Sequence, residues 1–460
     1  MSTRGVLVVA VGLVVLGGAA AGIGPASAGA APTIGGPSVV GYYDRVTLTG
    51  TTPAPDQAVT VYFRSAASST YASSRQFTSD SSARFSLSYF ERQSLYYYAQ
   101  VGTVRSTVHR TALVVATCTV SAPAFTRVAL AGFQPRGWHS PQLTDFASMS
   151  ASANGVWAGA AVTFNQSSDA TVAVIRWTGG SRATVLNTFT YRGGFPVLGE
   201  NSEASVSVAG VTHSGAVVAA VAGTSRAVAN QMFQGFVWAN GQRYRLHAPS
   251  GWSVHPTGVY GLSGAIVGWV RNGPTSSATH SYAVSWATPT SPLTKIAEIS
   301  AGYGSSVSAD AAGDIAYVDV NQHSQVHISG ADYPLTGPHG ENGEGRLFSG
   351  PGTHFYGSQY GPIVRWNVQY PSASGIRPER TIAPRDDTLW IAAAGGRGDV
   401  VVGWDAGKQH LRTSYGAYRA LPAEPSLTGG VAPETAINEN GTVAFTSTKD
   451  SLVHLLRCTR

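Results

Sequence analysis

The sequence has few of the residues on which several familiar classes of protein depend. Only 2 of its 460 residues are cysteine and 12% are charged, whereas about 25% are charged in an average soluble domain. Two cysteines exclude a disulfide-dense scaffold, a zinc ribbon and a four-cysteine iron–sulfur site. Lysine occurs only at Lys295, Lys408 and Lys449, so arginine carries almost all of the positive charge. The arginines form no cluster along the chain, which argues against a nucleic-acid-binding protein.

Long hydrophobic runs are also absent, with one exception at the amino terminus. Arg4 precedes an apolar stretch from Gly5 to Gly22, and Ala26-Ser27-Ala28 fits the small-x-small pattern of a cleavage site. We expect residues 1–28 to be a signal peptide, with an uncleaved anchor helix as the alternative. No later segment has 18 consecutive apolar residues, so the mature chain is expected to have no transmembrane helix.

Export determines what the two cysteines are expected to do. A signal peptide without a nearby cysteine excludes a lipoprotein anchor, so we expect a secreted protein that is extracellular or associated with the cell surface. In that oxidising environment Cys118 and Cys458 are expected to form a disulfide. This bridge would close a loop of about 340 residues, the kind of loop that stabilises most in the chain-entropy description.

Glycine and short β-forming runs are what the chain has in abundance. It contains 54 glycines, and runs rich in Val, Thr, Tyr and Phe alternate with clusters of Gly, Ser, Asn and Pro. This pattern is typical of all-β proteins, and helical periodicity is almost absent.

Residues 33–115 are predicted to form one small sandwich. Alternating runs occur at Val46–Gly50, Ala58–Arg64, Arg84–Tyr89 and Tyr96–Val101. The module resembles the immunoglobulin-like modules of exported bacterial proteins, in which a Phe-containing strand precedes a Tyr-Tyr-x-Ala strand. The resemblance implies a spacer or binding domain. The module has no cysteine pair, so it lacks the core bridge of antibody domains.

Residues 118–460 contain a repeat. A turn that ends in glycine and is followed by an apolar run recurs seven times, at Gly155, Gly215, Gly264, Gly313, Gly352, Gly398 and Gly441. A third run often ends in tryptophan, at Trp177, Trp238, Trp286 and Trp366, and we expect these side chains to pack between repeats. Four strands in about 40–50 residues are typical of a propeller blade. We therefore predict an all-β protein: an immunoglobulin-like β-sandwich followed by a seven-bladed β-propeller.

The last repeat has only three predicted strands, so its fourth strand is expected from the start of the region. Thr126–Leu130 has the fourth-strand pattern, and its pairing with the last repeat would close the ring by terminal strand closure. The repeat resembles the extracellular HAF-type propeller repeat, and Gly235–Gly241 corresponds to its Ala-Phe-x-Trp-x-x-Gly strand. A β-solenoid of seven repeats and a pair of sandwiches are the competing interpretations.

Motifs of known enzymes are absent. There is no Gly-x-Ser-x-Gly elbow, His-Glu-x-x-His helix or Walker loop. The glycine-rich segment Gly337–Gly345 does not have the residue order of a calcium loop. His323 and His327, four residues apart on a predicted strand, would lie about 13 Å apart, which is too far for one metal ion. No metal or other cofactor is expected.

A binding site is predicted only through the propeller. Loops that join the fourth strand of one blade to the first strand of the next gather around one mouth of such a ring. These loops are rich in aromatic and acidic residues, and the candidates are Trp138, His139, Asp145, Trp252, His255, Tyr303, His339, Glu341, Asp386 and Asp387. Aromatic faces beside carboxylates suit sugar rings and their hydroxyls.

These observations predict a secreted binding or surface-associated protein, without enzymatic activity, that recognises an extracellular glycan or a surface protein. One alternative is a glycoside hydrolase or lyase that acts on extracellular polysaccharide, with a pair of mouth carboxylates about 5–10 Å apart. Another is an adhesion or protein-docking platform. The alternative without a binding function is that these loops are polar simply because loops are exposed to solvent.

Overall fold

The computed structural model describes residues 30–41, 45–71, 73–90, 93–114, 117–120, 145–151, 155–164, 170–178, 183–191, 206–223, 232–260, 264–274, 278–300, 307–310, 312–337, 346–349, 354–358, 363–369, 371–372, 374–383, 389–394, 400–404, 409–412, 418–420, 435–438, 441–447 and 452–459. Throughout these residues the regular structure is β, without helix, and the strands form several separate sheets. The prediction of an all-β protein is confirmed. The predicted signal peptide, residues 1–28, lies outside the described residues.

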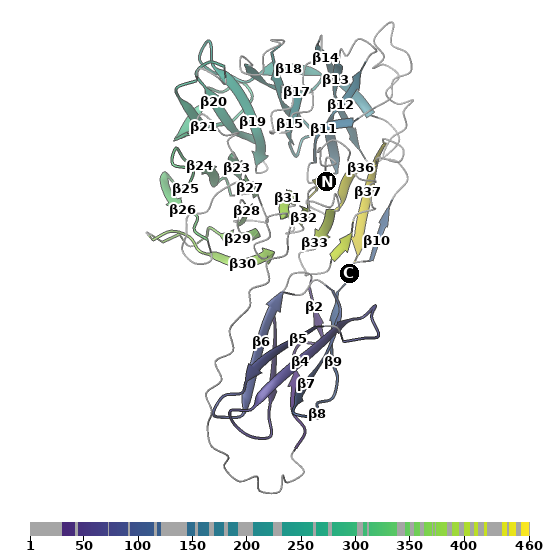
Figure 1. The fold of residues 1–460 in the computed structure, drawn as a ribbon. Helices are drawn as coiled ribbons and strands as arrows, with labels where there is room; N and C mark the ends of the chain where they lie inside the picture. The colour runs from purple at the N-terminus through teal and green to yellow at the C-terminus, as the bar shows by residue number, and fades with distance from the viewer. Residues whose placement is uncertain are drawn as a thin grey trace, which may run out of the picture. The chain divides into compact units, whose positions relative to one another are not determined.

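The first nine strands form two sheets (Figure 1). They are β1 (Thr33–Gly35), β2 (Val39–Val40), β3 (Arg45–Thr51), β4 (Ala58–Ser65), β5 (Ser73–Thr78), β6 (Arg84–Phe90), β7 (Leu95–Val101), β8 (Val104–Arg105) and β9 (His109–Leu113). One sheet has the order β1-β3-β6, and the other has the order β2-β9-β7-β4-β5, with β8 paired to β7. Alternate residues are buried, among them Val46 and Leu48 on β3 and Val59 and Val61 on β4, because successive side chains of a strand point to opposite faces.

The remaining strands form seven four-stranded antiparallel sheets. Six of these sheets use strands that are consecutive in the chain: β11 (Asp145–Ala151), β12 (Val156–Phe164), β13 (Ala170–Thr178) and β14 (Ala183–Tyr191); β15 (Val206–Val211), β16 (Val217–Ala222), β17 (Phe233–Ala239) and β18 (Gln242–Arg245); β19 (Ser253–Tyr260), β20 (Ala265–Arg271), β21 (Ser281–Trp286) and β22 (Thr294–Ile299); β23 (Val307–Ala309), β24 (Ile315–Val318), β25 (Ser324–Ile328) and β26 (Ala331–Pro334); β27 (Arg346–Ser349), β28 (His354–Ser358), β29 (Ile363–Asn367) and β30 (Pro378–Ala383); β31 (Leu389–Ala394), β32 (Val400–Trp404), β33 (Gln409–Arg412) and β34 (Tyr418–Ala420). The seventh has the order β10-β37-β36-β35, from β10 (Thr117–Val120), β35 (Thr435–Ile437), β36 (Val443–Ser447) and β37 (Leu452–Thr459).

The first strands of these sheets contact one another in chain order. β11 contacts β15, and the series continues through β19, β23, β27 and β31 to β35, which also contacts β11. Burial follows the position of a strand in its sheet. Every residue of the second strands β16 and β20 is buried, whereas the fourth strand β18 has three exposed residues and one half-buried residue. Exposed side chains therefore collect on the last strands β18, β22 and β26.

The glycine of the repeat lies in the turn between the first and second strands. Its φ is positive in all five described cases: Gly155 (74°), Gly215 (81°), Gly264 (69°), Gly313 (93°) and Gly441 (72°). Glycine adopts this conformation without the steric cost that a Cβ brings. In three turns the residue three positions earlier ties the loop, because Thr212, Asp310 and Asn438 each accept a backbone N–H from beyond the glycine. The repeat in the sequence is thus a repeated hairpin turn.

The tryptophans of the third strands are buried between sheets, as predicted. Trp238 packs among residues of β12, β13 and β15, and Trp286 packs among residues of β16, β17 and β19. The indole N–H of Trp286 donates to the His247 carbonyl at 2.8 Å, and that of Trp366 donates to the Thr336 carbonyl at 2.7 Å. Both carbonyls follow the fourth strand of the preceding sheet, so each hydrogen bond joins neighbouring sheets.

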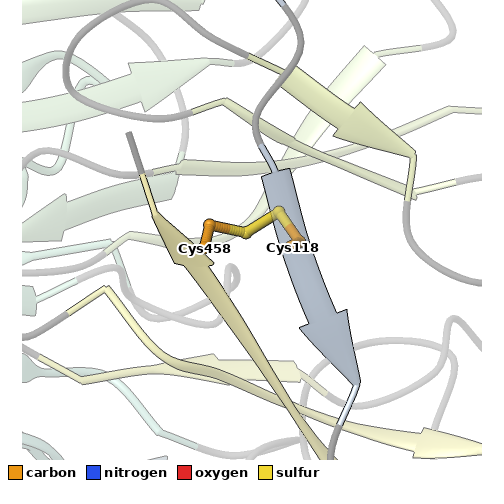
Figure 2. Close-up of a disulfide and its surroundings, with 2 residues drawn as sticks. All are labelled: Cys118 and Cys458. Atoms are coloured by element: carbon orange, nitrogen blue, oxygen red, sulfur yellow. A yellow bond between two sulfur atoms is a disulfide. The ribbon is translucent and has the colours of Figure 1, made fainter.

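The last sheet is completed from the other end of the sequence. β10 pairs antiparallel with β37, and Cys118 lies directly opposite Cys458. The two cysteines form a disulfide across this pair (Figure 2), which confirms the prediction. In Figure 1 the blue β10 lies beside the yellow β37. The predicted strand was placed wrongly: Thr117–Val120 is the fourth strand, not Thr126–Leu130, because the cysteine lies on the pairing strand itself.

Removal of the disulfide tests how much this pairing depends on it. We expect Cys118→Ser with Cys458→Ser to lower the free energy of unfolding by up to about 5 kcal/mol, because the bridge restricts a very long loop in the unfolded chain. Denaturant unfolding of the oxidised wild type and the double variant measures this difference. Intact mass with and without reductant should differ by two hydrogens, and equal masses would contradict the bridge.

Candidate functional site

The ten candidate binding residues differ in what the structure says of them. Seven of them, Trp138, His139, Tyr303, His339, Glu341, Asp386 and Asp387, lie outside the described residues. Asp145 is the first residue of β11, and its side chain is not described. Trp252 and His255 lie on either side of the start of β19. The described part of the predicted mouth is therefore the beginning of this strand.

The side chain of His255 is buried, whereas the prediction placed it among the residues that bind a ligand. Its side chain is 6% exposed and stacks on Trp269, with ring centroids 4.8 Å apart and planes at 6°. The ring of Phe233 meets it edge-on at 4.8 Å. Neither imidazole nitrogen has a hydrogen-bond partner among the described residues. The residue is part of the packing between sheets because it lies on a first strand, whose side chains are covered from both sides.

A buried cation lies next to this histidine. The Arg271 guanidinium is 4.5 Å from the Trp269 ring centroid, and its Nε donates to Ser281 Oγ at 3.3 Å. Burial, and secondly the charge of Arg271, lower the pKa of His255 to about 4. His255 is therefore uncharged at neutral pH, and its ring packs as an aromatic side chain.

Trp252, three residues earlier, is half-buried and belongs to a group of stacked rings. Its ring centroid is 5.9 Å from that of Tyr282, with planes at 24°. Tyr282 in turn stacks with His280 at 6.4 Å and 14°. Two charged residues of β22, Lys295 and Glu298, border these rings. We call these five residues, Trp252, His280, Tyr282, Lys295 and Glu298, the aromatic ladder.

Strand register explains why these residues meet. Tyr282 on β21 lies directly opposite Glu298 on β22, so the two side chains share a face of the sheet. Lys295 lies two pairs further along and extends back over the rings. Its Nζ is 3.8 Å from the Tyr282 centroid and 5.3 Å from the Trp252 centroid. Trp252 joins from the segment before β19.

The polar ends of the ladder are open to solvent. His280 Nδ1 is 2.8 Å from Glu298 Oε1, and their side chains are 54% and 47% exposed. Lys295 is also exposed, whereas Tyr282 is half-buried. The ladder therefore offers ring surface together with an ammonium group, a carboxylate and an imidazole at the rim.

This arrangement suits some ligands better than others. Aromatic surface packs against the C–H groups of a sugar, and charged groups at its edge bind hydroxyls. A cationic ligand is disfavoured, because the ammonium group of Lys295 already occupies the face of Tyr282 that such a ligand would need. Glycoside cleavage needs two carboxylates, and Glu298 is the only one in the ladder.

Sequence reasoning found one of the five ladder residues. The predicted mouth consists of loops, whereas His280, Tyr282, Lys295 and Glu298 lie on or beside β21 and β22. One signal was available: Lys295 is one of three lysines in the chain. The stacking itself depends on pairing between strands and had no local signal.

Two further features were sought among the described residues. These residues include no group of three or more His, Cys, Asp or Glu side chains arranged to hold a metal ion. Within the same described segments, no helix is long and apolar enough to cross a membrane.

Comparison with known proteins leaves the family open. No protein-family model and no curated protein matches the sequence, so the resemblance to HAF-type repeats stays a prediction. Solved structures that resemble this chain include PorZ, a bacterial surface component of the type-IX secretion system of Porphyromonas gingivalis, with 9% identity and a TM-score of 0.42 over 83% of this chain and 54% of PorZ. The chain thus corresponds to about half of PorZ.

Two further similar structures have names that refer to carbohydrates. The Hadza microbial sialidase Hz136 is 8% identical with a TM-score of 0.37, over 93% of this chain and 95% of the sialidase. The SapL1 lectin, solved with alpha methyl fucoside, is 11% identical with a TM-score of 0.33, over 69% of this chain and 93% of the lectin. Since the TM-scores lie below 0.5, these likenesses assign no function to this chain.

The buried histidine predicts a dependence of stability on pH. In the unfolded chain the pKa of histidine is near 6.5, so as the pH falls the unfolded state takes up the proton before the folded state does. The free energy of unfolding should therefore fall between about pH 6.5 and pH 4, by up to about 3 kcal/mol. Burial, together with the nearby Asp314, raises the pKa of Asp310 to about 6, and this group has the opposite effect.

Replacement of the histidine isolates its contribution. We expect His255→Phe, which keeps an aromatic ring, to unfold with a weaker loss of stability on acidification than the wild type, as measured by denaturant unfolding across this pH range. The exposed His247 provides the control His247→Phe, which should keep the wild-type slope. Equal slopes for wild type and His255→Phe would contradict the prediction.

Proposed function

We propose that this is an exported carbohydrate-binding protein in which the seven four-stranded sheets are the blades of a β-propeller and the aromatic ladder holds a sugar. The observation that carries the proposal is the stack of Trp252, Tyr282 and His280 bordered by Lys295 and Glu298. A pyranose ring packs on the exposed part of the stacked rings, and the charged rim groups hydrogen-bond to its hydroxyls.

The ring architecture is supported by three observations. Each sheet has four antiparallel strands, and in six sheets these strands are consecutive. The first strands contact one another in a cycle that returns from β35 to β11. The last sheet takes its fourth strand, β10, from before the first blade, which is how a propeller joins its ends without leaving an open strand edge.

The domain order and the location form part of the same proposal. The two sheets of β1–β9 constitute the immunoglobulin-like module of residues 33–115, and residues 118–460 constitute the propeller. Residues 1–28 direct export. The disulfide of Cys118 and Cys458 supports export, because disulfides form and persist mainly in oxidising compartments.

Binding, rather than cleavage, is the activity that the ladder supports. Glu298 is paired with His280 at 2.8 Å, so its carboxylate is held at the rim. A retaining or inverting glycosidase needs a second carboxylate within about 10 Å, and the ladder supplies none. The ladder can therefore recognise a sugar but lacks the pair of groups that would protonate and displace its glycosidic bond.

A glycan array with three proteins tests this proposal. We expect the wild type to bind a defined set of glycans and Trp252→Ala to lose about tenfold or more in affinity, as expected when a central aromatic contact is truncated. Lys295→Met, which keeps the length of the side chain, should also weaken binding. Circular dichroism and thermal unfolding establish that the variants are folded.

A matched control is available on the neighbouring sheet. Arg243 on the last strand β18 lies 5.0 Å over the ring of Phe236 on β17. Like Lys295 on β22, it is a cation on a last strand that lies over an aromatic ring. Arg243→Met should leave glycan binding unchanged. Absence of glycan binding by the folded wild type would overturn the proposal, and release of reducing sugar from a polysaccharide would favour an enzyme instead.

A further inference from the structure

A second surface, on the strands β4, β7 and β8, combines tyrosine rings with arginine side chains. On β4 the residues Val59 and Val61 are buried, so Tyr62 and Arg64 lie on the opposite face of the sheet. β7 neighbours β4 in the sheet. On β7 the alternate residues Leu95, Tyr97 and Ala99 are buried and face the core. Tyr96 and Tyr98 therefore share the face of Tyr62. With Tyr71 and Arg105, they form what we call the tyrosine–arginine face: Tyr62, Arg64, Tyr71, Tyr96, Tyr98 and Arg105.

The rings of this face contact one another directly. Tyr62 stacks on Tyr98, with centroids 4.9 Å apart and planes at 18°. Tyr71 meets Tyr98 edge-on at 4.7 Å and 73°. Tyr98 is 7% exposed although its side chain points away from Tyr97 and the core, because its neighbours on the face cover it. The face is thus a packed aromatic layer on the outside of the sheet.

Two guanidinium groups lie on these rings. Arg64 is 4.2 Å from the Tyr96 centroid and 5.4 Å from the Tyr71 centroid, and it donates to the Ser68 carbonyl. Arg105 is 5.0 Å from the Tyr98 centroid. Its Nε donates to Gln100 Oε1 at 3.0 Å, and its two terminal nitrogens have no hydrogen-bond partner among the described residues. Arg64 is therefore held in place, and Arg105 has donors to offer.

Among the described residues, no carboxylate forms an ion pair with Arg64 or Arg105. The two acidic residues described in strands β1–β9 and their turns, Asp56 and Asp80, lie in the turns before β4 and after β5. Asp80 accepts the backbone N–H groups of Ser82 and Arg84. Solvent-facing sides of antiparallel sheets are ordinarily polar, so a layer of packed tyrosine rings bordered by guanidinium groups on this side is a candidate binding surface.

The chemistry of the face selects its ligand. A guanidinium group presents parallel donors that match the two oxygens of a carboxylate, and tyrosine rings pack against the C–H faces of sugars. We propose that the tyrosine–arginine face binds an acidic polysaccharide, a chain of uronic-acid residues, with Arg105 pairing to a carboxylate. This is a second binding surface, separate in sequence and in sheet from the aromatic ladder.

Binding of an oligogalacturonate to the full-length protein tests the proposal, with fluorescence anisotropy of a labelled oligomer as the measurement. We expect saturable binding by the wild type that weakens with salt and is lost when the oligomer is fully methyl-esterified, because the ester removes the charge but keeps the sugar ring. Equal binding of the charged and esterified oligomers would overturn the proposal. Equal or tighter binding of inorganic polyphosphate or single-stranded DNA would also overturn it.

Variants on the same sheet separate a specific site from general charge. Arg105→Gln should weaken binding about fivefold or more, while Arg75→Gln should leave it unchanged. Arg75 is exposed on β5 and pairs with Val61, so it lies on the other side of the sheet and its replacement removes the same charge. Equal effects of the two variants would overturn the proposal. Arg105 is exposed, so its replacement is expected to leave the fold intact, and thermal unfolding checks this.

Two of these variants show whether the two proposed sites act independently. Trp252→Ala should bind the oligogalacturonate as the wild type does, while Arg105→Gln should keep the glycan-array signal assigned to the ladder. Loss of oligogalacturonate binding in Trp252→Ala would assign this activity to the ladder and overturn the proposal for the tyrosine–arginine face.

Discussion

The pairing of β10 with β37 is the constraint on which the arrangement of the later sheets depends. β35, β36 and β37 alone would leave the edge of β37 without a partner, and an open edge invites pairing with other chains. β10 fills that edge, and the disulfide joins residues 340 positions apart across it. Because β35 also contacts β31 and β11, the position of this sheet relates the last repeat to the first.

Burial decreases from the first and second strands of a sheet to its last strand, so a ligand would be reached on the last strands. Where their side chains are described, first and second strands are mostly enclosed by neighbouring sheets, and two third-strand tryptophans, Trp286 and Trp366, join one sheet to the next through indole hydrogen bonds. The fourth strands β18, β22 and β26 carry most of the exposed side chains of their sheets. This is why His255, on a first strand, is buried against Trp269, while Trp252, just before that strand, reaches the rings and charges of β21 and β22.

Cations over aromatic rings recur in this charge-poor chain. Lys295 lies over Tyr282, Arg243 over Phe236 and Arg271 over Trp269, and Arg64 and Arg105 lie over tyrosines of the first module. An aromatic ring attracts a cation and also supplies apolar surface. Sugar binding is proposed at two such groups. The aromatic ladder is proposed to bind the hydroxyls of a sugar, and the tyrosine–arginine face is proposed to bind its carboxylates.

The sequence by itself determined the features that depend on neighbouring residues or on covalent chemistry. Alternating β-formers predicted an all-β chain, the recurrent glycine marked a turn, the tryptophans marked contacts between repeats, and the expected signal peptide led to the prediction of the disulfide. Only the tertiary structure decided that Thr117–Val120 completes the last sheet, that His255 is enclosed, and that Tyr282 and Lys295 meet Trp252. The reason is physical: turns and alternation are set by adjacent residues, whereas these contacts depend on which distant strands pair and in which register.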